Sequence, residues 1–197
     1  MFRRLSWSSD GLFISTTAGK IGKVNMAPLI QRSSWSNLAT LCGHMKSINA
    51  SRINPKLYKD PSLCREFDPR TGQYEEKLAC YSVVALGSID TSISVWKPHL
   101  SKPFTTILDL FKSGITDLTW AFNGNILMGC SMDGQAMFIH YEPGALGEPI
   151  TEQEKQIIIE NKYGSTILGE YKKNNRVQNK VASQNSQITS NQVNKPL

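Results

Sequence analysis

The residues His44, Ser88 and Asp90 can be combined on paper into a hydrolase triad. A catalytic serine needs a neighbouring base, an exposed and strained turn such as Gly-x-Ser-x-Gly, and an oxyanion hole. Residues 86–90 instead read LGSID, which is typical of a strand that enters a tight turn. We therefore interpret these residues as parts of a scaffold and predict that the chain is not an enzyme.

The stretch that contains Ser88 recurs further along the chain. Residues 87–96 read GSIDTSISVW and residues 130–139 read CSMDGQAMFI, with serine, any residue and aspartate before a short alternating strand. Another pair, RRLSWSSDG at 3–11 and TDLTWAFNG at 116–124, has a leucine two residues before its tryptophan. SRINPK at 51–56 is a degenerate third copy. Self-similarity of this kind indicates a repeat architecture.

Each copy begins a unit of about four short strands. Apolar runs follow at 12–16, 81–88 and 125–131, and closing strands are expected at 37–43 and 104–110. Four short antiparallel strands in about 40–60 residues are typical of a β-propeller blade, whose strands are buried by neighbouring blades on both faces. We predict an all-β fold with about three blades in residues 1–144. The charged stretch 57–79 is expected to be an exposed loop inserted in the middle unit.

The sequence changes character from residue 145. Thr151-x-x-Glu154 is a capping box, which predicts a short helix over about 151–161 in a post-propeller segment, 145–170. Residues 171–197 are basic and rich in Asn and Gln, so we expect a disordered tail. About three blades do not close a propeller, and the open ends would expose apolar sheet faces. We therefore expect the chain to be a fragment of a longer protein.

The same spacing that argues against a triad fits a structural network. A Gly-His pair ending at His44 begins the middle blade, Ser88-x-Asp90 lies at the turn between its second and third strands, and Trp96 ends the third strand. This is the spacing of the buried hydrogen-bond network of WD repeats. We predict that Asp90 orients the His44 ring, that His44 meets the Ser88 hydroxyl, and that Ser88 accepts from the indole. The second copy lacks the Gly-His pair and the tryptophan, so Asp133 is predicted to keep only a turn role.

The net charge of +6 is unevenly distributed along the chain. Residues 1–56 carry eight Lys and Arg against one Asp, residues 57–170 carry nine against fifteen acidic residues, and residues 171–197 carry five and no acidic residue. A uniform basic groove for nucleic acid would not have this pattern. It fits either an ordinary solvated surface with a basic tail, or separate acidic and basic faces that meet a basic, nucleic-acid-associated partner.

The four cysteines, Cys42, Cys64, Cys80 and Cys130, lie far apart and form no Cys-x-x-Cys motif. We predict that they are reduced and intracellular, with Cys42 and Cys130 acting as small apolar residues. A zinc site that combines three of these cysteines with His44 fails on spacing. We therefore predict no metal, no cofactor and no small-molecule substrate. No apolar run reaches the length of a membrane helix.

Arg4 lies in a predicted innermost strand, where the matching residue of the other copies is Asp117 or Ala50. One interpretation is a channel-facing arginine or a salt bridge. The other is that Arg4 and its neighbour Arg3 contact a partner, because arginine is enriched at binding hot spots.

The chain closely resembles the later blades of the WD-repeat domain of the HIRA/Hir histone-chaperone family, over about residues 2–169. The motifs that carry this resemblance are RRLSWSSDG, LCGH, INPKLYK, ALGSIDTSISVWKPHLSKP, LFKSGITDLTWAFNGNILMGCSMDG and LGEPITEQEK. The last is specific, because generic WD-repeat proteins lack it. The resemblance implies about three blades of a seven-bladed-type propeller.

The resemblance also implies a function. It indicates a nuclear, chromatin-associated and non-enzymatic subunit that deposits the replacement variant of histone three, with histone four, outside replication, and that regulates or represses transcription. Its implied partners are a ubinuclein-type subunit at the propeller, the anti-silencing histone chaperone, and a calcineurin-binding-type subunit, with histones contacted indirectly. In this family an arginine-rich segment binds the anti-silencing chaperone. The tail 171–197 has no arginine cluster, so that contact is not evident here.

A second class of function remains open. The chain could be a WD-repeat adaptor of another complex, for instance in ubiquitin ligation, and a hydrolase is a distant third reading. The LGEPITEQEK segment favours the first class over the second.

Overall fold

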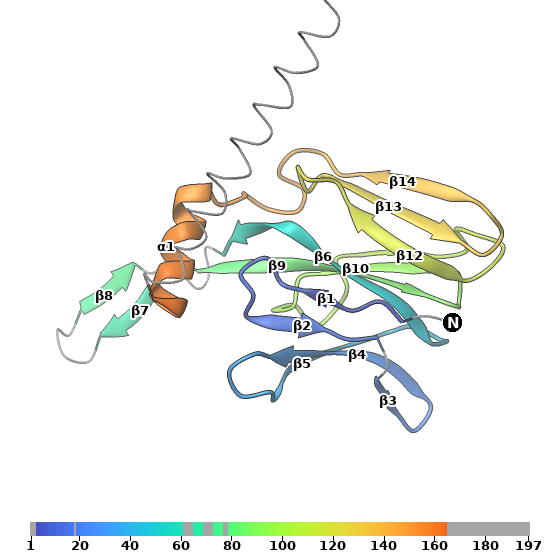
Figure 1. The fold of residues 1–197 in the computed structure, drawn as a ribbon, viewed down its shortest axis with the longest axis horizontal. Helices are drawn as coiled ribbons and strands as arrows, with labels where there is room; N and C mark the ends of the chain where they lie inside the picture. The colour runs from blue at the N-terminus through green and yellow to red at the C-terminus, as the bar shows by residue number, and fades with distance from the viewer. Residues whose placement is uncertain (1–2, 18, 61–64, 69–72, 77–78, 165–197) are drawn as a thin grey trace, which may run out of the picture. The chain divides into compact units, whose positions relative to one another are not determined.

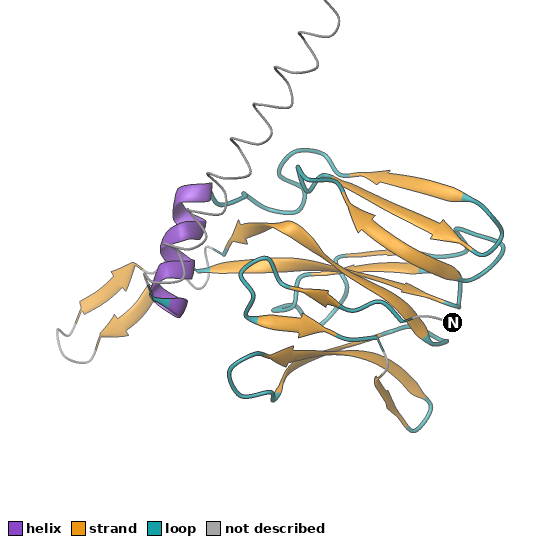
Figure 2. Ribbon diagram, viewed as in Figure 1, coloured by secondary structure: helices purple, strands orange, loops and turns teal. Residues whose placement is uncertain are grey.

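The computed structural model describes residues 3–17, 19–60, 65–68, 73–76 and 79–164 (Figure 1). Two compact units divide the chain at residue 151. Strands dominate the described part of the first unit, and a single helix occurs in that of the second (Figure 2). Three antiparallel sheets, each the counterpart of one predicted repeat, make up most of the first unit.

The first sheet has four strands in sequence order and one short extra strand. Its members are β1 (Ser6–Trp7), β2 (Phe13–Ser15), β4 (Val24–Gln31), β5 (Asn37–Cys42) and the extra β3 (Gly19–Ile21). β4 pairs with β2 near its end and with β3 near its start, so β3 continues the line of β2. β5 closes the sheet along the other edge of β4.

The middle sheet is a complete four-stranded blade. It consists of β6 (Ile48–Lys59), β9 (Cys80–Ser88), β10 (Ile93–Trp96) and β11 (Thr105–Ile107), paired in that order. Between β6 and β9 lies a separate hairpin of β7 (Arg65–Asp68) and β8 (Gln73–Glu76).

The expectation of an exposed loop over 57–79 was therefore wrong for its first residues, which belong to β6, and it missed the hairpin of β7 and β8. Leu57 and Tyr58 are buried, and after a bulge they pair with Ser82 and Tyr81. Two large apolar side chains continue β6 because the sheet offers them a place to be buried. The backbone of β7 and β8 forms its own ladder within the insertion.

The third sheet has three strands in the described part of the chain, β12 (Ile115–Trp120), β13 (Ile126–Ser131) and β14 (Ala136–His140). The segment after β14 returns to the middle blade. The N–H of Ile150 donates to the carbonyl of Leu57 at 2.9 Å, and the N–H of Lys59 donates to the carbonyl of Glu148 at 2.8 Å. The Tyr81 hydroxyl also donates to the carbonyl of Leu146 at 2.8 Å. This return segment fastens the third sheet to the extended end of β6.

The core lies between neighbouring sheets, and β9 contributes to it on both faces. Val83 and Ala85 pack in the cluster shared with the third sheet, whereas Val84 and Leu86 pack in the cluster shared with the first sheet. All four are fully buried. An apolar run without polar alternation is what a strand buried on both faces requires, and this explains the sequence YSVVALGS.

The second unit contains α1 (Glu152–Tyr163), close to the predicted helix over about 151–161. Its first turn carries Glu152 and Glu154 and its last turn carries Lys162, as the helix dipole favours. No helix among the described residues is both long and apolar enough to cross a membrane. The predicted tail, 171–197, lies outside the described residues.

Close approach of the second and third blades depends on Gly87. A Cβ atom at this position would lie 2.6 Å from Cγ2 and 3.1 Å from Cβ of Ile115, which is itself fully buried. We predict that Gly87→Ala lowers the stability of the protein by about 1–3 kcal/mol, as overpacked cores do. Thermal unfolding followed by circular dichroism measures this. An unchanged melting temperature would contradict the tight contact.

Candidate functional site

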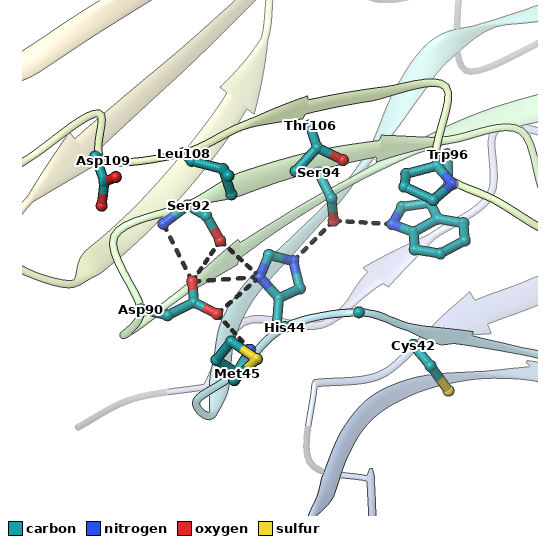
Figure 3. Close-up of a pocket in the computed structure, with 12 residues that line it drawn as sticks. Cys42, His44, Met45, Asp90, Ser92, Ser94, Trp96, Thr106, Leu108 and Asp109 are labelled. Carbon is teal, nitrogen blue, oxygen red and sulfur yellow. Dashed lines mark hydrogen bonds and ion pairs between the residues drawn. The ribbon is translucent and has the colours of Figure 1, made fainter.

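A hydrogen-bonded network joins the link between β5 and β6 to β10 (Figure 3). His44 Nε2 lies 2.7 Å from Ser94 Oγ, and the Trp96 indole N–H donates to the same oxygen at 2.8 Å. On the other side of the ring, His44 Nδ1 lies 2.9 Å from Ser92 Oγ and 3.3 Å from the Asp90 carboxylate. Ser92 donates from its hydroxyl to Asp90. The side chains of the network thus form one continuous chain.

The donors of the chain fix its direction. The Asp90 carboxylate can only accept, so the Ser92 hydroxyl that donates to it is left to accept from His44 Nδ1. His44 Nε2 accordingly accepts from Ser94, which itself accepts from the Trp96 indole N–H. His44 then carries its proton on Nδ1 and donates it towards Ser92 and Asp90. This assignment gives each side-chain donor of the network an acceptor.

Burial lowers the pKa of His44, although the neighbouring Asp90 opposes the shift. The ring is therefore neutral at physiological pH. Burial opposes ionisation of Asp90 as well, but the hydrogen bond from the Ser92 side chain, the attraction of His44 and hydrogen bonds from backbone N–H groups outweigh it, and the pKa of Asp90 falls to about 2. Met45 N–H donates to Asp90 Oδ2 at 2.7 Å, and Lys46 N–H donates to it at 3.3 Å. The Ser92 hydroxyl and these backbone N–H groups thus hold the Asp90 carboxylate in place.

The structure places His44, Asp90 and Trp96 together as the sequence analysis proposed, but it gives the predicted role of Ser88 to Ser94. The reason is strand geometry, because Ser94 and Trp96 are two residues apart and share one face of β10. Ser92, which sequence reasoning missed, follows the same alternation. The pattern Ser-x-Ser-x-Trp at 92–96 was the signal that could have identified both serines.

Ser88 instead clamps the link that precedes the blade. Its hydroxyl lies 3.0 Å from the carbonyl of Ser47 and 3.2 Å from that of Lys46, and it accepts from the Asp90 N–H at 3.1 Å. Together, Ser88 and Asp90 hold both the donors and the acceptors of residues 45–47. The Ser-x-Asp motif therefore ties a blade to the connection from the blade before it.

The second copy of the motif makes the same clamp one blade later. Ser131 donates to the carbonyl of Ser113 at 2.9 Å, and Asp133 accepts from the Lys112 N–H at 2.9 Å. Asp133 also accepts from the Gln135 N–H in its own turn at 3.0 Å. The prediction that Asp133 has only a turn role was thus too narrow, because this residue also holds the incoming chain.

Inner strands of all three sheets meet at a second site. Arg4 forms a parallel bridge with Ala50, in which the Arg4 N–H donates to the carbonyl of Asn49 at 2.9 Å. The Ser51 N–H donates back to the carbonyl of Arg4 at 3.0 Å. The backbone at Arg4 is thereby paired to β6 of the middle blade.

Asp117 of β12 receives arginines from two other blades. Arg52 Nη2 lies 2.9 Å from one oxygen and Arg4 Nε lies 3.5 Å from the other. The Arg4 side chain is 50% exposed and Arg3 is exposed, so both face solvent at this edge. The three positions that the repeats align, Arg4, Ala50 and Asp117, thus lie together in space. The salt-bridge interpretation of Arg4 is thus realised in the geometry.

Comparison with known proteins identifies relatives along most of this chain. No protein-family model matches it. It is 32% identical to the human "Protein HIRA" over 164 residues, which are 83% of this chain and 15% of that protein. It is 37% identical to "Protein HIR1" of Cryptococcus neoformans over 142 residues, which are 72% of this chain and 15% of that protein. The chain belongs to the HIRA/Hir family. The "Protein HIRA homolog" of Drosophila melanogaster matches at 33% identity over 165 residues, 84% of this chain and 15% of the relative.

Membership of the HIRA/Hir family and the blade-like sheets agree on the architecture. The predicted all-β, WD-repeat propeller fold is confirmed, with three antiparallel sheets as blades. The chain spans about 15% of the length of the curated relatives it matches.

The cysteines of this HIRA/Hir chain differ from the prediction in their environment. Cys42 and Cys130 are exposed free thiols rather than buried apolar residues. Each follows or precedes a buried residue, such as Leu41, so strand alternation turns it outward. Within the described part of the chain, no group of three or more His, Cys, Asp or Glu side chains is arranged to hold a metal ion.

The network predicts different results for the two serines. Ser94→Ala removes the acceptor of the Trp96 indole and should destabilise the protein by about 1–3 kcal/mol, since a buried donor loses its partner. The Trp96 indole N–H resonance should also shift and lose its protection from hydrogen exchange. Ser88→Ala should leave that resonance in place, because Ser88 bonds the 46–47 link instead. Loss of indole protection in Ser88→Ala would contradict the assignment.

Acid should destabilise the fold in two stages. The folded pKa of His44 is lowered by burial, so the unfolded chain binds this proton more readily and stability is lost as pH falls below about 6.5. The pKa of Asp90 is about 2 when folded, so its contribution is lost as pH falls from about 4 towards 2.

Melting temperatures measured from pH 7 to pH 5 test the first stage. The decrease should be smaller in His44→Gln, even though that variant is less stable at neutral pH. His140→Gln, at an exposed position, is the matched control. Equal pH slopes in His44→Gln and the wild type would refute the assignment of this stage to His44.

Proposed function

We propose that this chain is part of a HIRA-type scaffold that holds other subunits together in replication-independent nucleosome assembly and in transcriptional regulation in the nucleus. The observation that carries the proposal is the family relationship, which extends over 83% of the chain in the human relative. The blades support it as well, because propellers present broad, rigid surfaces built from loops and strand ends.

The geometry of the network supports a scaffold over an enzyme. Ser92 and Ser94 are buried and use their hydroxyls within the chain that ends at Trp96. The Ser88 hydroxyl is engaged with backbone carbonyls. A nucleophile needs a free, exposed oxygen beside its base. Each polar group here satisfies another buried group, which stabilises the blade.

The proposed partners are a ubinuclein-type subunit, the anti-silencing histone chaperone and a calcineurin-binding-type subunit, with histones reached through them. Of these, the ubinuclein-type subunit is assigned to the blades, with Arg3 and Arg4 as candidate contacts. Both are exposed beside an inner strand, and Arg4 adds its positive charge to this edge while it also contacts Asp117. An exposed guanidinium such as that of Arg3 can form paired hydrogen bonds with a partner carboxylate.

A charge-reversal pull-down tests this assignment. The double variant Arg3→Glu and Arg4→Glu should weaken capture of a ubinuclein-type subunit about tenfold or more, since exposed interfacial charges set association and specificity. Lys20→Glu with Lys23→Glu makes the same charge change at exposed positions of the first sheet and should bind normally.

Two other results would count against the proposal. Capture of a ubiquitin-ligase core in place of the ubinuclein-type subunit would favour the adaptor function. Loss of circular dichroism signal in the Arg3 and Arg4 variant would assign Arg4 to the fold, through Asp117, rather than to binding.

A further inference from the structure

A pocket of about 250 Å³ opens beside the His44 network. One wall is the 42–45 link and the other is formed by β10 and the chain around β11, as Figure 3 shows. The network forms its floor, and the side chains of Met45 and Leu108 stand at its rim, 86% and 68% exposed. These two exposed side chains border the same opening, so they give the pocket an apolar rim above its polar floor.

The charge of the pocket is negative. Its lining includes two carboxylates, Asp90 and Asp109, and no lysine or arginine. His44, the remaining basic residue of the lining, is neutral because burial lowers its pKa. The lining therefore carries a formal charge of −2, and the low-dielectric walls concentrate its field at the opening. A cationic group is favoured here and an anion is disfavoured.

The two carboxylates differ in what they can offer a ligand. Asp90 already accepts from the N–H groups of Met45, Lys46 and Ser92, so it contributes charge but few free lone pairs. Asp109 is exposed at the mouth of the pocket. A direct contact with a ligand therefore falls to Asp109, with Asp90 adding a longer-range attraction from below.

The other residues that line the pocket indicate which kind of cation fits it. Met45, Pro103 and Leu108 offer aliphatic contacts, and the Trp96 indole N–H is already used by Ser94. A bare metal ion would need several free oxygen ligands, which this lining does not provide. A long aliphatic stem that ends in a compact ammonium matches both features, whereas a guanidinium favours bidentate and stacked partners.

We propose that this pocket binds the side chain of a lysine in an extended segment of a basic partner protein. The lysine stem lies along Met45 and Leu108, and its ammonium donates to the Asp109 carboxylate. The adaptable thioether of Met45 suits such a contact. The proposal goes beyond the scaffold function and does not depend on which complex holds the chain.

The backbone conformation of Asp109 allows a substitution that changes only the charge of its side chain. This residue has a φ of 51°, in the left-handed region that asparagine and aspartate tolerate better than other non-glycine residues. Asp109→Asn therefore keeps the backbone conformation and removes only the charge. Glu142→Gln removes the same charge from an exposed residue outside the pocket and is the matched control.

The experiment uses the full chain with ¹³C-labelled methionine and leucine methyl groups. A capped pentapeptide with one lysine among glycines is titrated, and the methyl resonances of Met45 and Leu108 are followed. They should shift saturably, with a dissociation constant on the order of 1 mM, as one exposed ion pair with a partly buried stem provides. Asp109→Asn should weaken binding about fivefold and Glu142→Gln should not.

Further titrations distinguish this lysine from other possible occupants of the pocket. An equal response to a norleucine peptide would mean an apolar groove only, and stronger binding of an arginine peptide would mean the wrong cation; either result overturns the proposal. Shifts that depend on protein concentration without peptide would assign the pocket to a second copy of the chain. An unchanged affinity in Asp109→Asn, or no shift with the lysine peptide, would also overturn it. A failed pull-down of the ubinuclein-type subunit would not affect this titration.

Discussion

Burial of β9 and β10 on both faces is the constraint from which the rest of the first unit follows. Val83 and Val84 are neighbours in sequence, yet they belong to different cores, one shared with the third sheet and one with the first. A strand in this position cannot carry a solvent-facing side, so polar groups in it must be paired internally. The network of His44 is the consequence, because it pairs the polar groups that the middle blade must bury next to its neighbour.

The Ser-x-Asp motif solves a related problem at the blade ends. Each connection between blades brings backbone N–H and carbonyl groups into partly buried surroundings, where unpaired groups are costly. Ser88 and Asp90 satisfy those of one link, and Ser131 and Asp133 satisfy those of the next. In the middle blade, His44 and Trp96 add further hydrogen bonds to the clamp formed by Ser88 and Asp90. The third blade has the corresponding clamp, formed by Ser131 and Asp133, but no such histidine or tryptophan, so the clamp is the more general of the two features.

Internal repeats predicted the blades, a capping box predicted the helix, and the spacing of WD repeats predicted three members of the network, because each of these is a local sequence pattern. Other features depend on what meets in space. Ser94, and not Ser88 as predicted, contacts the imidazole of His44, because the side chain of Ser94 lies on the face of β10 that is turned towards the ring. The pairing of Arg4 with Asp117 joins residues of different blades. The return of Glu148 and Ile150 to β6 has no local signal either, since its partners lie far away in sequence. Long-range contacts of this kind leave no periodicity to detect.

Charged side chains of this chain differ in whether their hydrogen-bonding capacity is already used within the fold. Asp90 has its oxygens engaged by donors of the chain itself, so it shapes the fold and lends only charge to the pocket. Asp109 and Arg3 lie exposed at two different edges and carry opposite charges. The link that carries His44 runs directly from one blade to the next, and β6 carries Ala50 a few residues later. The proposed contacts at Asp109 and at Arg3 therefore both lie in the first unit, next to strands of the same middle blade, and a binding site is positioned more precisely when it is built on strands than on long loops.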